Sequence, residues 1–478
     1  MLVAEIERQR AFVEDGWIER DVNGTDSGLH ALVEIVTSFD RRGVRDYRWT
    51  ITRLGEARAW ADRYVTLLRR GLEHERVATA AAVRSAMRSV DAMLAVDRPK
   101  NPFRMLVREV ATVFATRGAL EELRSALLRA LEREVVPALR SIRMFLAREY
   151  LPRAPRHVEE AIYRHHLARH LGPDHLSPDA LRRWGAAEVS RWQRDLGAAV
   201  VIAFGLATSL PRAMARIARD PALRFGGEDE LLRVARTELV RARAIAERVM
   251  TVPEGALRVE RVPAHLETTM LAQYLTPRGG EGTLQLNTTK LLRAQRRHEL
   301  PTLITHEAFG GHHVAAIHAE SRMGLPELRR FANVSAFDEG WALYAEQVRD
   351  ELGGFDPIER IGYLGQQLWR AARLVIDTSL HDGTMSQAAA VSYLERVVFL
   401  PPARARAEVR RYLDCPAQAL AYYVGKAHFL ETRAEAKRIL GSDFDLRRFH
   451  DKLLSLCAVP LNEARAEILI WASKATHR

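Results

Sequence analysis

The sequence predicts a mainly α-helical protein with one small β-ribbon, and three observations support this prediction. Residues 1–225 repeat apolar side chains with a helical period and are rich in Ala, Leu and Arg, which favour helices. Residues 257–262 and 283–288 alternate between apolar and polar side chains in the manner of strands. The chain has 478 residues, of which 47% are hydrophobic, so it can form one large or two ordinary globular domains.

We divide the chain at residue 225. Residues 1–225 form a helical N-terminal half without a motif that we can interpret chemically. Residues 226–478 begin with a long helical pattern, contain both strand-like segments and carry every motif with chemical content. We expect this second half to be the metal-binding, catalytic part of one compact unit that surrounds a deep cleft.

Charge and cysteine content limit the partners and the compartment. The net charge of +11 comes almost wholly from arginines that alternate with acids along helices, which is typical of solvated helix faces. We therefore expect no nucleic-acid partner, and no apolar run is long enough to predict a membrane partner. The residues from Met1 to Glu7 are acidic where a secretory signal is basic, and the only two cysteines fit a reducing compartment. These observations predict a cytoplasmic protein and leave its oligomeric state open.

Residues 306–313 read H-E-A-F-G-G-H-H and carry the main chemical signal. An imidazole beside a carboxylate, followed by further imidazoles, is the combination that a zinc hydrolase requires. His306 is the first expected ligand, and Glu307 is the expected general base. The usual spelling H-E-x-x-H places two histidines on one helical face, and this segment does not have that spacing.

A continuous helix would separate His306 and His312 by roughly 9 Å along its axis, which is too far for one ion. Gly310 and Gly311 permit a bulge or break that draws the later histidines back. His312 follows Gly311 directly and is the preferred second ligand. His313 is the competing candidate and otherwise an outer partner of the site.

Residues 337–346 read F-D-E-G-W-A-L-Y-A-E and supply the second part of the site. Glu339 and Glu346 are seven residues apart, so both carboxylates lie on one helical face. Glu339 is the expected third metal ligand, and Glu346 is expected to orient a ligating imidazole from outside the ligand sphere. The alternative is a solvated acidic stripe on an amphipathic helix.

These two segments resemble the hallmark of a large bacterial family, domain of unknown function 885, which reads H-E-A-x-P-G-H-H and then E-G-W-A-x-Y-x-E. Further resemblance lies in residues 369–381, 411–422, 444–450 and 459–461, and the whole extends over roughly residues 225–470. The chain departs from the family pattern at Gly310, where proline is usual, and at Ser379, where glycine is usual. The resemblance implies a metallopeptidase-like site similar to that of gluzincin carboxypeptidases, and it indicates a reaction class without a substrate.

Two further groups of residues are candidates for substrate contacts. Arg370, Arg373 and Asp377 share one helical face, with His381 one turn further on. This stripe is either a structural salt-bridge ladder or a lining whose arginines grip a substrate carboxylate. Tyr422, in a segment that resembles the family, or His381 is expected to stabilise the developing oxyanion.

The strand-like residues 283–287 lie just upstream of His306 and are expected to pair with the backbone of an extended substrate. An ordinary two-stranded connector is the alternative.

The sequence therefore predicts a hydrolase that uses Zn²⁺, or another divalent metal, to cleave a peptide or peptide-like amide bond in a small substrate, with carboxypeptidase-like cleavage as one form. A non-haem iron enzyme would use the same two histidines and one glutamate, but it would not need Glu307. A non-catalytic binding protein with a vestigial site is the third alternative.

Overall fold

The computed structural model describes Arg10, Glu14 and residues 16–24, 27–37, 41, 43–95, 98, 101–113, 115–205, 208–262, 271–278, 281–330 and 332–475. The expectation about residues 1–7 lies outside this part of the chain. Helices dominate the described residues, and their strands form one three-stranded sheet. The mainly α-helical prediction is confirmed.

The chain forms two compact units. Among the described residues, the N-terminal unit contains those from 10 to 159 with 413–415, and the larger unit contains those from 160 to 412 and from 416 to 475. The change between units thus falls at residue 160, earlier than the division that we placed at residue 225. Helices within residues 160–225 pack with the larger unit because α10 (Pro178–Phe204) lies along α17 (Pro357–His381).

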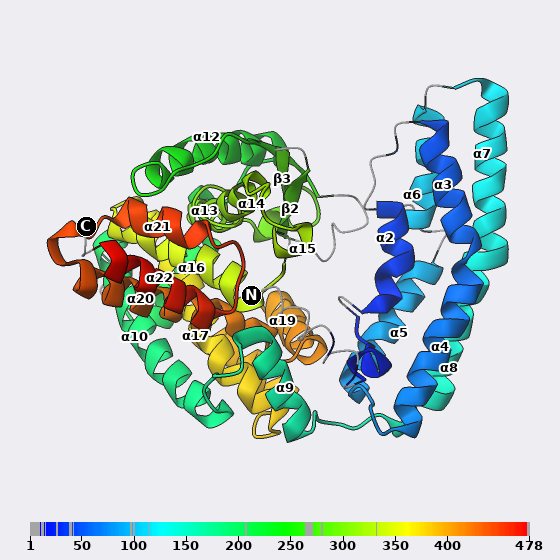
Figure 1. Cartoon of the computed structure of the whole chain (residues 1–478), viewed down its shortest axis with the longest axis horizontal. Coiled ribbons are helices and arrows are strands. Elements are labelled where there is room, and N and C mark those ends of the chain that lie inside the picture. Colours follow the sequence, from blue (N-terminus) through cyan, green and yellow to red (C-terminus); the bar gives the residue numbers. More distant parts are fainter. Residues whose placement is uncertain are drawn as a thin grey trace. The chain divides into compact units, whose positions relative to one another are not determined.

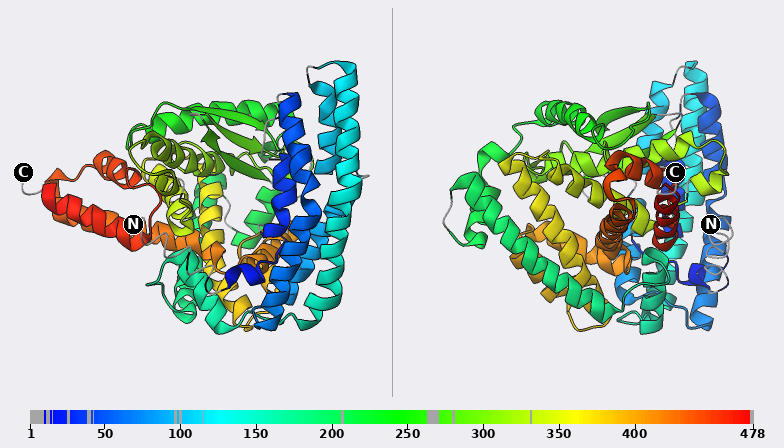
Figure 2. Two further views of the ribbon diagram at one scale, coloured as in Figure 1. Left: turned by 45° about the vertical axis from the view of Figure 1, so that its right-hand side comes forward. Right: turned by 60° about the vertical axis from the view of Figure 1, so that its left-hand side comes forward.

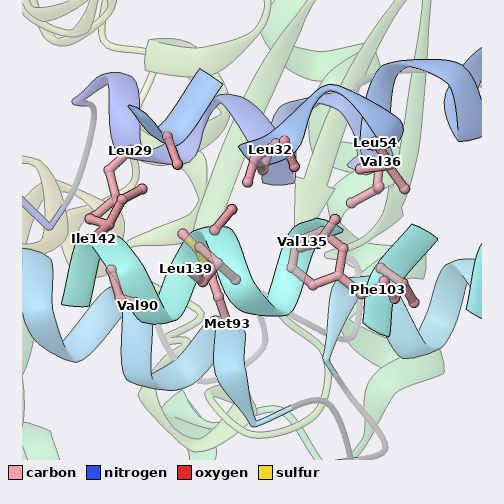
Figure 3. Packing of buried hydrophobic residues seen from close by; sticks show 14 of the residues in the cluster. Leu29, Leu32, Val36, Leu54, Val90, Met93, Phe103, Val135, Leu139 and Ile142 are labelled. Carbon is pink, nitrogen blue, oxygen red and sulfur yellow. The ribbon is translucent and has the colours of Figure 1, made fainter. Parts of the chain in front are cut away.

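The N-terminal unit is a set of helices (Figures 1 and 2), and their buried side chains form one apolar core. Its α-helices are α2 (Ala31–Thr37), α3 (Val44–Gly55), α4 (Ala57–Glu73), α5 (Ala80–Leu94), α6 (Pro102–Glu109), α7 (Arg117–Ala130) and α8 (Val136–Phe145). Leu32, Leu139 and Ile142 are among the fully buried side chains that the helices share (Figure 3). This core satisfies the helical periodicity of the first half of the sequence.

The larger unit is also built mainly from helices. Besides α10 and α17, they are α9 (Glu160–Leu171), α11 (Leu210–Arg219), α12 (Glu228–Ala246), α13 (Leu300–Glu307), α14 (His312–Ser321), α15 (Glu327–Arg330), α16 (Ser335–Glu351), α18 (Gln387–Val397), α19 (Pro402–Asp414), α20 (Ala421–Leu440), α21 (Leu446–Leu454) and α22 (Leu461–Ala475). Helix α16 packs against α20, and α20 packs against α22. Among the described helices of both units, none combines the length and apolar character that crossing a bilayer requires.

The sheet has three strands in the order β1-β3-β2. Strand β1 (Ala256–Arg261) pairs in parallel with β3 (Glu281–Leu286), and β2 (Ala272–Arg278) pairs with β3 in antiparallel fashion. Alternation of side chains in the sequence predicts β1 and β3 but not β2. Because β3 is the central strand, both of its edges are occupied, and the expectation that residues 283–287 pair with a substrate backbone is wrong.

Candidate metal centre

The segment that carries the paired histidines is a broken helix. Helix α13 ends at Glu307, and α14 begins at His312. Between them Gly310 adopts a φ of +109°, a conformation that favours glycine. A Cβ atom at Gly311 would lie 1.9 Å from the carbonyl oxygen of His306, so only glycine permits this close return of the backbone. The turn therefore brings His312 back beside the end of α13.

Helix α16 supplies the carboxylates. Glu339 and Glu346 lie on one face of this helix, which spans both. Its Gly340 meets Gly425 of α20 so closely that a Cβ atom at Gly340 would lie 2.4 Å from the Gly425 Cα atom. This contact sets α16 against α20 and places Glu339 on the same side as Tyr422.

The structure brings three predicted ligands together. The Nε2 atom of His306 lies 3.5 Å from Glu339 Oε2, and the Nε2 atom of His312 lies 3.4 Å from the same oxygen. The ligand atoms of these residues lie within 4.8 Å of one another, and they form the one such group of three or more in the described residues. His306 is buried, whereas the side chains of His312 and Glu339 each retain 21% exposure.

This donor set fits a zinc ion. Zinc bonds to nitrogen and oxygen of about 2.0–2.1 Å in a tetrahedron imply ligand atoms roughly 3.3 Å apart. The two observed separations from Glu339 are close to that value. Two imidazoles and one carboxylate from the protein also leave a fourth position open, as catalytic zinc sites do.

The histidines and glutamates of the site shift one another's pKa. Burial alone would lower the pKa of His306, but its hydrogen bonds with Glu339 and Glu346 raise that pKa to about 9. Burial would raise the pKa of Glu339, yet the two imidazoles hold it well below the usual range. Glu307 is half-buried beside this group, and its charge contributes to the raised pKa of both His306 and His312.

The second nitrogen of His306 has a partner of its own. Its Nδ1–H donates a hydrogen bond of 2.8 Å to Oε1 of Glu346, which is fully buried. Such a bond keeps Nδ1 protonated, so Nε2 is the nitrogen that a metal ion would bind in place of a proton. The structure thus places Glu346 where an orienting carboxylate was expected.

His313 is turned away from this group. It is buried, and its Nδ1 shares a hydrogen bond of 3.0 Å with the hydroxyl of Tyr274 on β2. Its ring also contacts Phe309 edge-on. Burial lowers the pKa of His313 to about 4, so the ring is neutral near pH 7. It joins α14 to the sheet instead of meeting the ligand atoms.

Tyr422 lies directly beside the ligand cluster, which is formed by the candidate ligands His306, His312 and Glu339. Its ring stacks on His306 with centroids 6.1 Å apart, and its hydroxyl accepts a hydrogen bond of 3.3 Å from Arg411. Burial and the nearby charge of Glu339 raise the pKa of Tyr422, so the phenol keeps its proton near pH 7.

The two predicted substrate arginines surround Tyr422. The guanidinium carbon atoms of Arg373 and Arg370 lie 4.5 Å and 5.8 Å from the centre of the Tyr422 ring. Arg373 also donates to the Tyr412 hydroxyl at 3.3 Å and approaches Glu408 at 3.4 Å, whereas Arg370 bonds to Gln366. Each arginine nevertheless has one buried N–H group without a hydrogen-bond partner in the described structure, at Arg370 Nε and Arg373 Nη1.

His381 makes a different set of contacts. Its Nε2–H donates a hydrogen bond of 3.0 Å to the backbone carbonyl of Tyr412, and its ring packs on Tyr163. Asp377 in turn accepts a hydrogen bond of 2.7 Å from the Tyr163 hydroxyl. The face that Asp377 and His381 share therefore belongs to a buried structural network, and these contacts of His381 do not include the candidate metal ligands.

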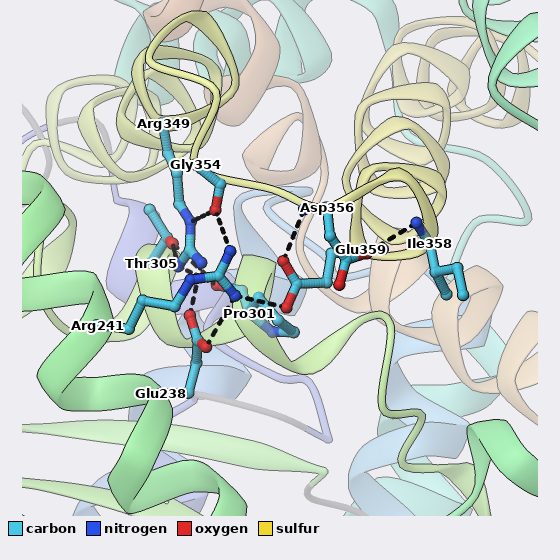
Figure 4. Close-up of polar contacts among 9 residues, drawn as sticks. All are labelled: Glu238, Arg241, Pro301, Thr305, Arg349, Gly354, Asp356, Ile358 and Glu359. Atoms are coloured by element: carbon cyan, nitrogen blue, oxygen red, sulfur yellow. Dashed lines mark hydrogen bonds and ion pairs between the residues drawn. The ribbon is translucent and has the colours of Figure 1, made fainter. Parts of the chain in front are cut away.

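A second buried network holds α13 in place (Figure 4). Arg349 of α16 donates to the carbonyl oxygen of Pro301 at 3.3 Å and to the hydroxyl of Thr305 at 2.9 Å. It also bonds to the carbonyl oxygen of Gly354 and lies 2.6 Å from a carboxylate oxygen of Glu238 on α12. Because Thr305 precedes His306, this network fixes the end of α13 that carries His306.

Sequence reasoning missed two residues behind Glu346. Gln367 of α17 donates to Glu346, and Lys426 of α20 donates to Gln367. The available signal was weak: Lys426 is a single lysine in a chain whose basic residues are mostly arginine, within a segment that is otherwise largely apolar.

Comparisons with known proteins agree with this picture of the fold. The family described as "Bacterial protein of unknown function (DUF885)" matches residues 1–468. A crystal structure of a putative lipoprotein from Colwellia psychrerythraea is similar, with 26% identity and a TM-score of 0.88 over 95% of this chain and 81% of that chain. A putative lipoprotein of unknown function from Shewanella oneidensis has 17% identity and a TM-score of 0.69 over 96% and 84% of the two chains, and it shows likeness of fold alone. No curated protein matches the sequence.

Proposed function

We propose that this chain, which belongs to the bacterial DUF885 family, is a zinc-dependent hydrolase of peptide or peptide-like amide bonds. The observation that carries the proposal is the convergence of His306, His312 and Glu339, with Glu307 adjacent to the first ligand. A partly buried two-histidine, one-glutamate cluster with an extra carboxylate beside it has the parts of a zinc hydrolase.

Zinc bound at this cluster would polarise the substrate carbonyl and make a water molecule acidic. Glu307 then accepts a proton from the attacking water as the water oxygen bonds to the carbonyl carbon. The same carboxyl group passes that proton to the amide nitrogen as the carbon–nitrogen bond breaks. The products are a carboxylic acid and an amine, and Glu307 returns to its charged form.

Tyr422 is suited to stabilise the carbonyl oxygen as it becomes negative. Its phenol keeps its proton, as its raised pKa requires, so it can donate a hydrogen bond to that oxygen. Its position against His306 supports this role. The contacts of His381 give no comparable support, so we assign the role to Tyr422.

The arginines around Tyr422 favour a substrate with a negative charge near the cleaved bond. Arg370 and Arg373 both lie against the ring of Tyr422, and guanidinium groups bind carboxylates well. A free carboxyl terminus would supply that charge, which corresponds to carboxypeptidase-like cleavage. Matched peptides with free and amidated carboxyl termini test this point, and equal kcat/KM for the two forms would contradict it.

The central test combines metal analysis with hydrolysis of a peptide library. The wild-type protein should contain about one zinc ion per chain and cleave a subset of the peptides. His306→Ala and Glu339→Ala should lose zinc, whereas Glu307→Gln should keep zinc and lose hydrolysis. Full zinc occupancy in both ligand variants would refute the assignment, and undiminished hydrolysis by Glu307→Gln would refute the role of that residue.

The compartment is also a proposal. The sequence contains only two cysteines, Cys415 and Cys457, which supports a reducing, cytoplasmic environment. The similar structure from Colwellia psychrerythraea is described as a putative lipoprotein, so attachment to a membrane is the competing location. Cell fractionation combined with labelling by a radioactive fatty acid distinguishes the two locations, and a labelled protein in the membrane fraction would exclude the cytoplasmic one.

A further inference from the structure

A chain of buried hydrogen bonds leads from the metal-site histidine into the core. His306 Nδ1–H donates to Glu346 Oε1 at 2.8 Å, and Glu346 Oε2 accepts from the Gln367 amide nitrogen at 3.0 Å. The Gln367 amide oxygen accepts from the ammonium group of Lys426 at 2.7 Å. The exposed fractions of Glu346, Gln367 and Lys426 are 0%, 0% and 1%, so water does not compete for these bonds.

When Lys426 is protonated, the donors and acceptors of these groups permit one direction only. An ammonium group has donors and no acceptor, so Lys426 must face the oxygen end of the Gln367 amide. The amide nitrogen then points to Glu346, and this carboxylate, which only accepts, must receive a proton donor from His306. The Nδ1 atom of His306 therefore carries hydrogen, and its Nε2 atom is left to bind a metal ion.

We propose that Gln367 and Lys426 are positioning residues that fix the tautomer and ring orientation of His306 through Glu346. This inference rests on the proposed metal function, because the orientation matters only if Nε2 is a ligand. Outer partners of ligating histidines commonly serve this purpose, and loss of one reduces metal affinity.

The surroundings of Lys426 support a specific role for its charge. The ammonium nitrogen lies 4.2 Å and 4.9 Å from the ring centres of Tyr423 and Trp192, and Gln367 is its one hydrogen-bond acceptor among the described residues. The nearby carboxylate of Glu188 is instead bonded to the Tyr423 hydroxyl. A buried cation without a paired carboxylate is unfavourable for stability, and an apolar residue of similar shape is often tolerated better. The two rings attract the cation, and the hydrogen bond to Gln367 gives the lysine a second role, which is to orient that amide.

The test measures zinc affinity by competition with a chelator in four variants of the full chain. Gln367→Met should weaken zinc binding by roughly 10- to 100-fold, and Lys426→Met by about 3- to 10-fold. The double variant should bind zinc no more weakly than Gln367→Met, because Lys426 acts only through Gln367. Lys437→Met is the matched control, since Lys437 is an exposed lysine on the same helix, and it should bind zinc as the wild type does.

A second measurement separates positioning from general loss of structure. Lys426→Met should unfold at the same or a higher urea concentration than the wild type while its zinc affinity falls, and its cobalt-substituted form should show an altered absorption spectrum. If Lys426→Met does not fold, Gln367→Glu answers the question: it still accepts from Lys426 but presents a second acceptor to Glu346, so zinc binding should weaken.

Wild-type zinc affinity and an unchanged cobalt spectrum in Lys426→Met, or in Gln367→Glu where that variant is needed, would overturn the inference. Additive losses in the double variant would overturn it as well. A wild-type chain that binds no divalent ion would overturn the proposed function together with the inference, whereas a zinc-binding wild type with unaffected variants would overturn the inference alone.

Discussion

Substitution of Gly311 by alanine is the most direct test of the turn that forms the ligand cluster. The added Cβ atom would lie 1.9 Å from the carbonyl oxygen of His306 and 2.6 Å from that of Thr305. Both atoms belong to the backbone of α13, so no flexible side chain can move aside. Real Cβ atoms essentially never approach another atom to less than 3.0 Å, and the turn must therefore open by more than about 1 Å.

An opening of this size is large for a metal site, whose ligand distances hold to about 0.2 Å. We expect Gly311→Ala to weaken zinc binding by at least about 100-fold, because it displaces a ligand and not only an outer partner. The metal-free protein should lose about 1–3 kcal/mol of stability, the usual cost of forcing an extra methyl group into a packed region. Chelator competition measures the first quantity, and urea unfolding in the presence of a chelator measures the second.

Two other glycines are the controls for this experiment. Gly310→Ala meets nothing closer than 3.5 Å but must adopt a φ of +109°, so backbone strain of about 1–3 kcal/mol is its main effect. Gly197→Ala, in α10, has nothing within 4 Å of its new Cβ atom and should leave zinc binding unchanged. A zinc affinity of Gly311→Ala within about threefold of that of Gly197→Ala would show that the position of His312 does not depend on this close contact.

Four further results are expected. His312→Ala should abolish zinc binding, whereas His313→Ala should keep zinc and lower the unfolding midpoint, because His313 joins α14 to the sheet; the reverse pattern in a zinc titration would make His313 the ligand. Tyr422→Phe should retain zinc and reduce kcat by roughly 100- to 1000-fold, and an unchanged kcat would exclude Tyr422 as the oxyanion donor. Arg349→Met should cost about 3–5 kcal/mol in urea unfolding because its buried carboxylate partner loses a cation, and a cost below about 1 kcal/mol would contradict this. Burial lowers the pKa of Lys426 from 10.5 to about 7, so between these pH values the folded state binds fewer protons than the unfolded state. The free energy of unfolding of the wild type should therefore rise relative to that of Lys426→Met between pH 7 and 10. Parallel curves of unfolding free energy against pH would show that Lys426 has the pKa of an ordinary lysine.

The strand order of the sheet could be predicted only in part from the sequence pattern. Strands β1 and β3 have alternating side chains, and the sequence analysis placed both within two residues of their observed bounds. Strand β2 contains Pro277, which counts against a strand because proline cannot donate to a ladder. Its pairing with β3 is irregular between Leu275 and Arg278, which accommodates the interruption. The parallel pairing of β1 with β3 depends on contacts between distant segments, so alternation could not reveal that β3 is central.

The boundary between the two units also differs from the one expected from the sequence. Composition changes near residue 225, where the strand-like segments begin, and the sequence analysis placed its boundary there. The structural boundary near residue 160 follows packing instead: Gly185 of α10 meets α17 so closely that a Cβ atom would lie 2.6 Å from Leu374 Cβ. A glycine within a predicted helix does not indicate which distant helix packs against it.

The ligand cluster was predictable to the extent that short spacings determine it. A helix fixes which residues share a face, so Glu339 and Glu346 could be assigned to one side of α16 from the sequence alone. Two adjacent glycines likewise indicated a break between His306 and His312. The partners that orient these residues come from segments remote in sequence, because Gln367 lies on α17 and Lys426 on α20. Their positions follow from how the helices pack, and the close contact between Gly340 and Gly425 shows how strict that packing is. The residues that would bind metal can thus be predicted from local spacing in the sequence, whereas the residues that orient them can be identified only from the packing of the helices.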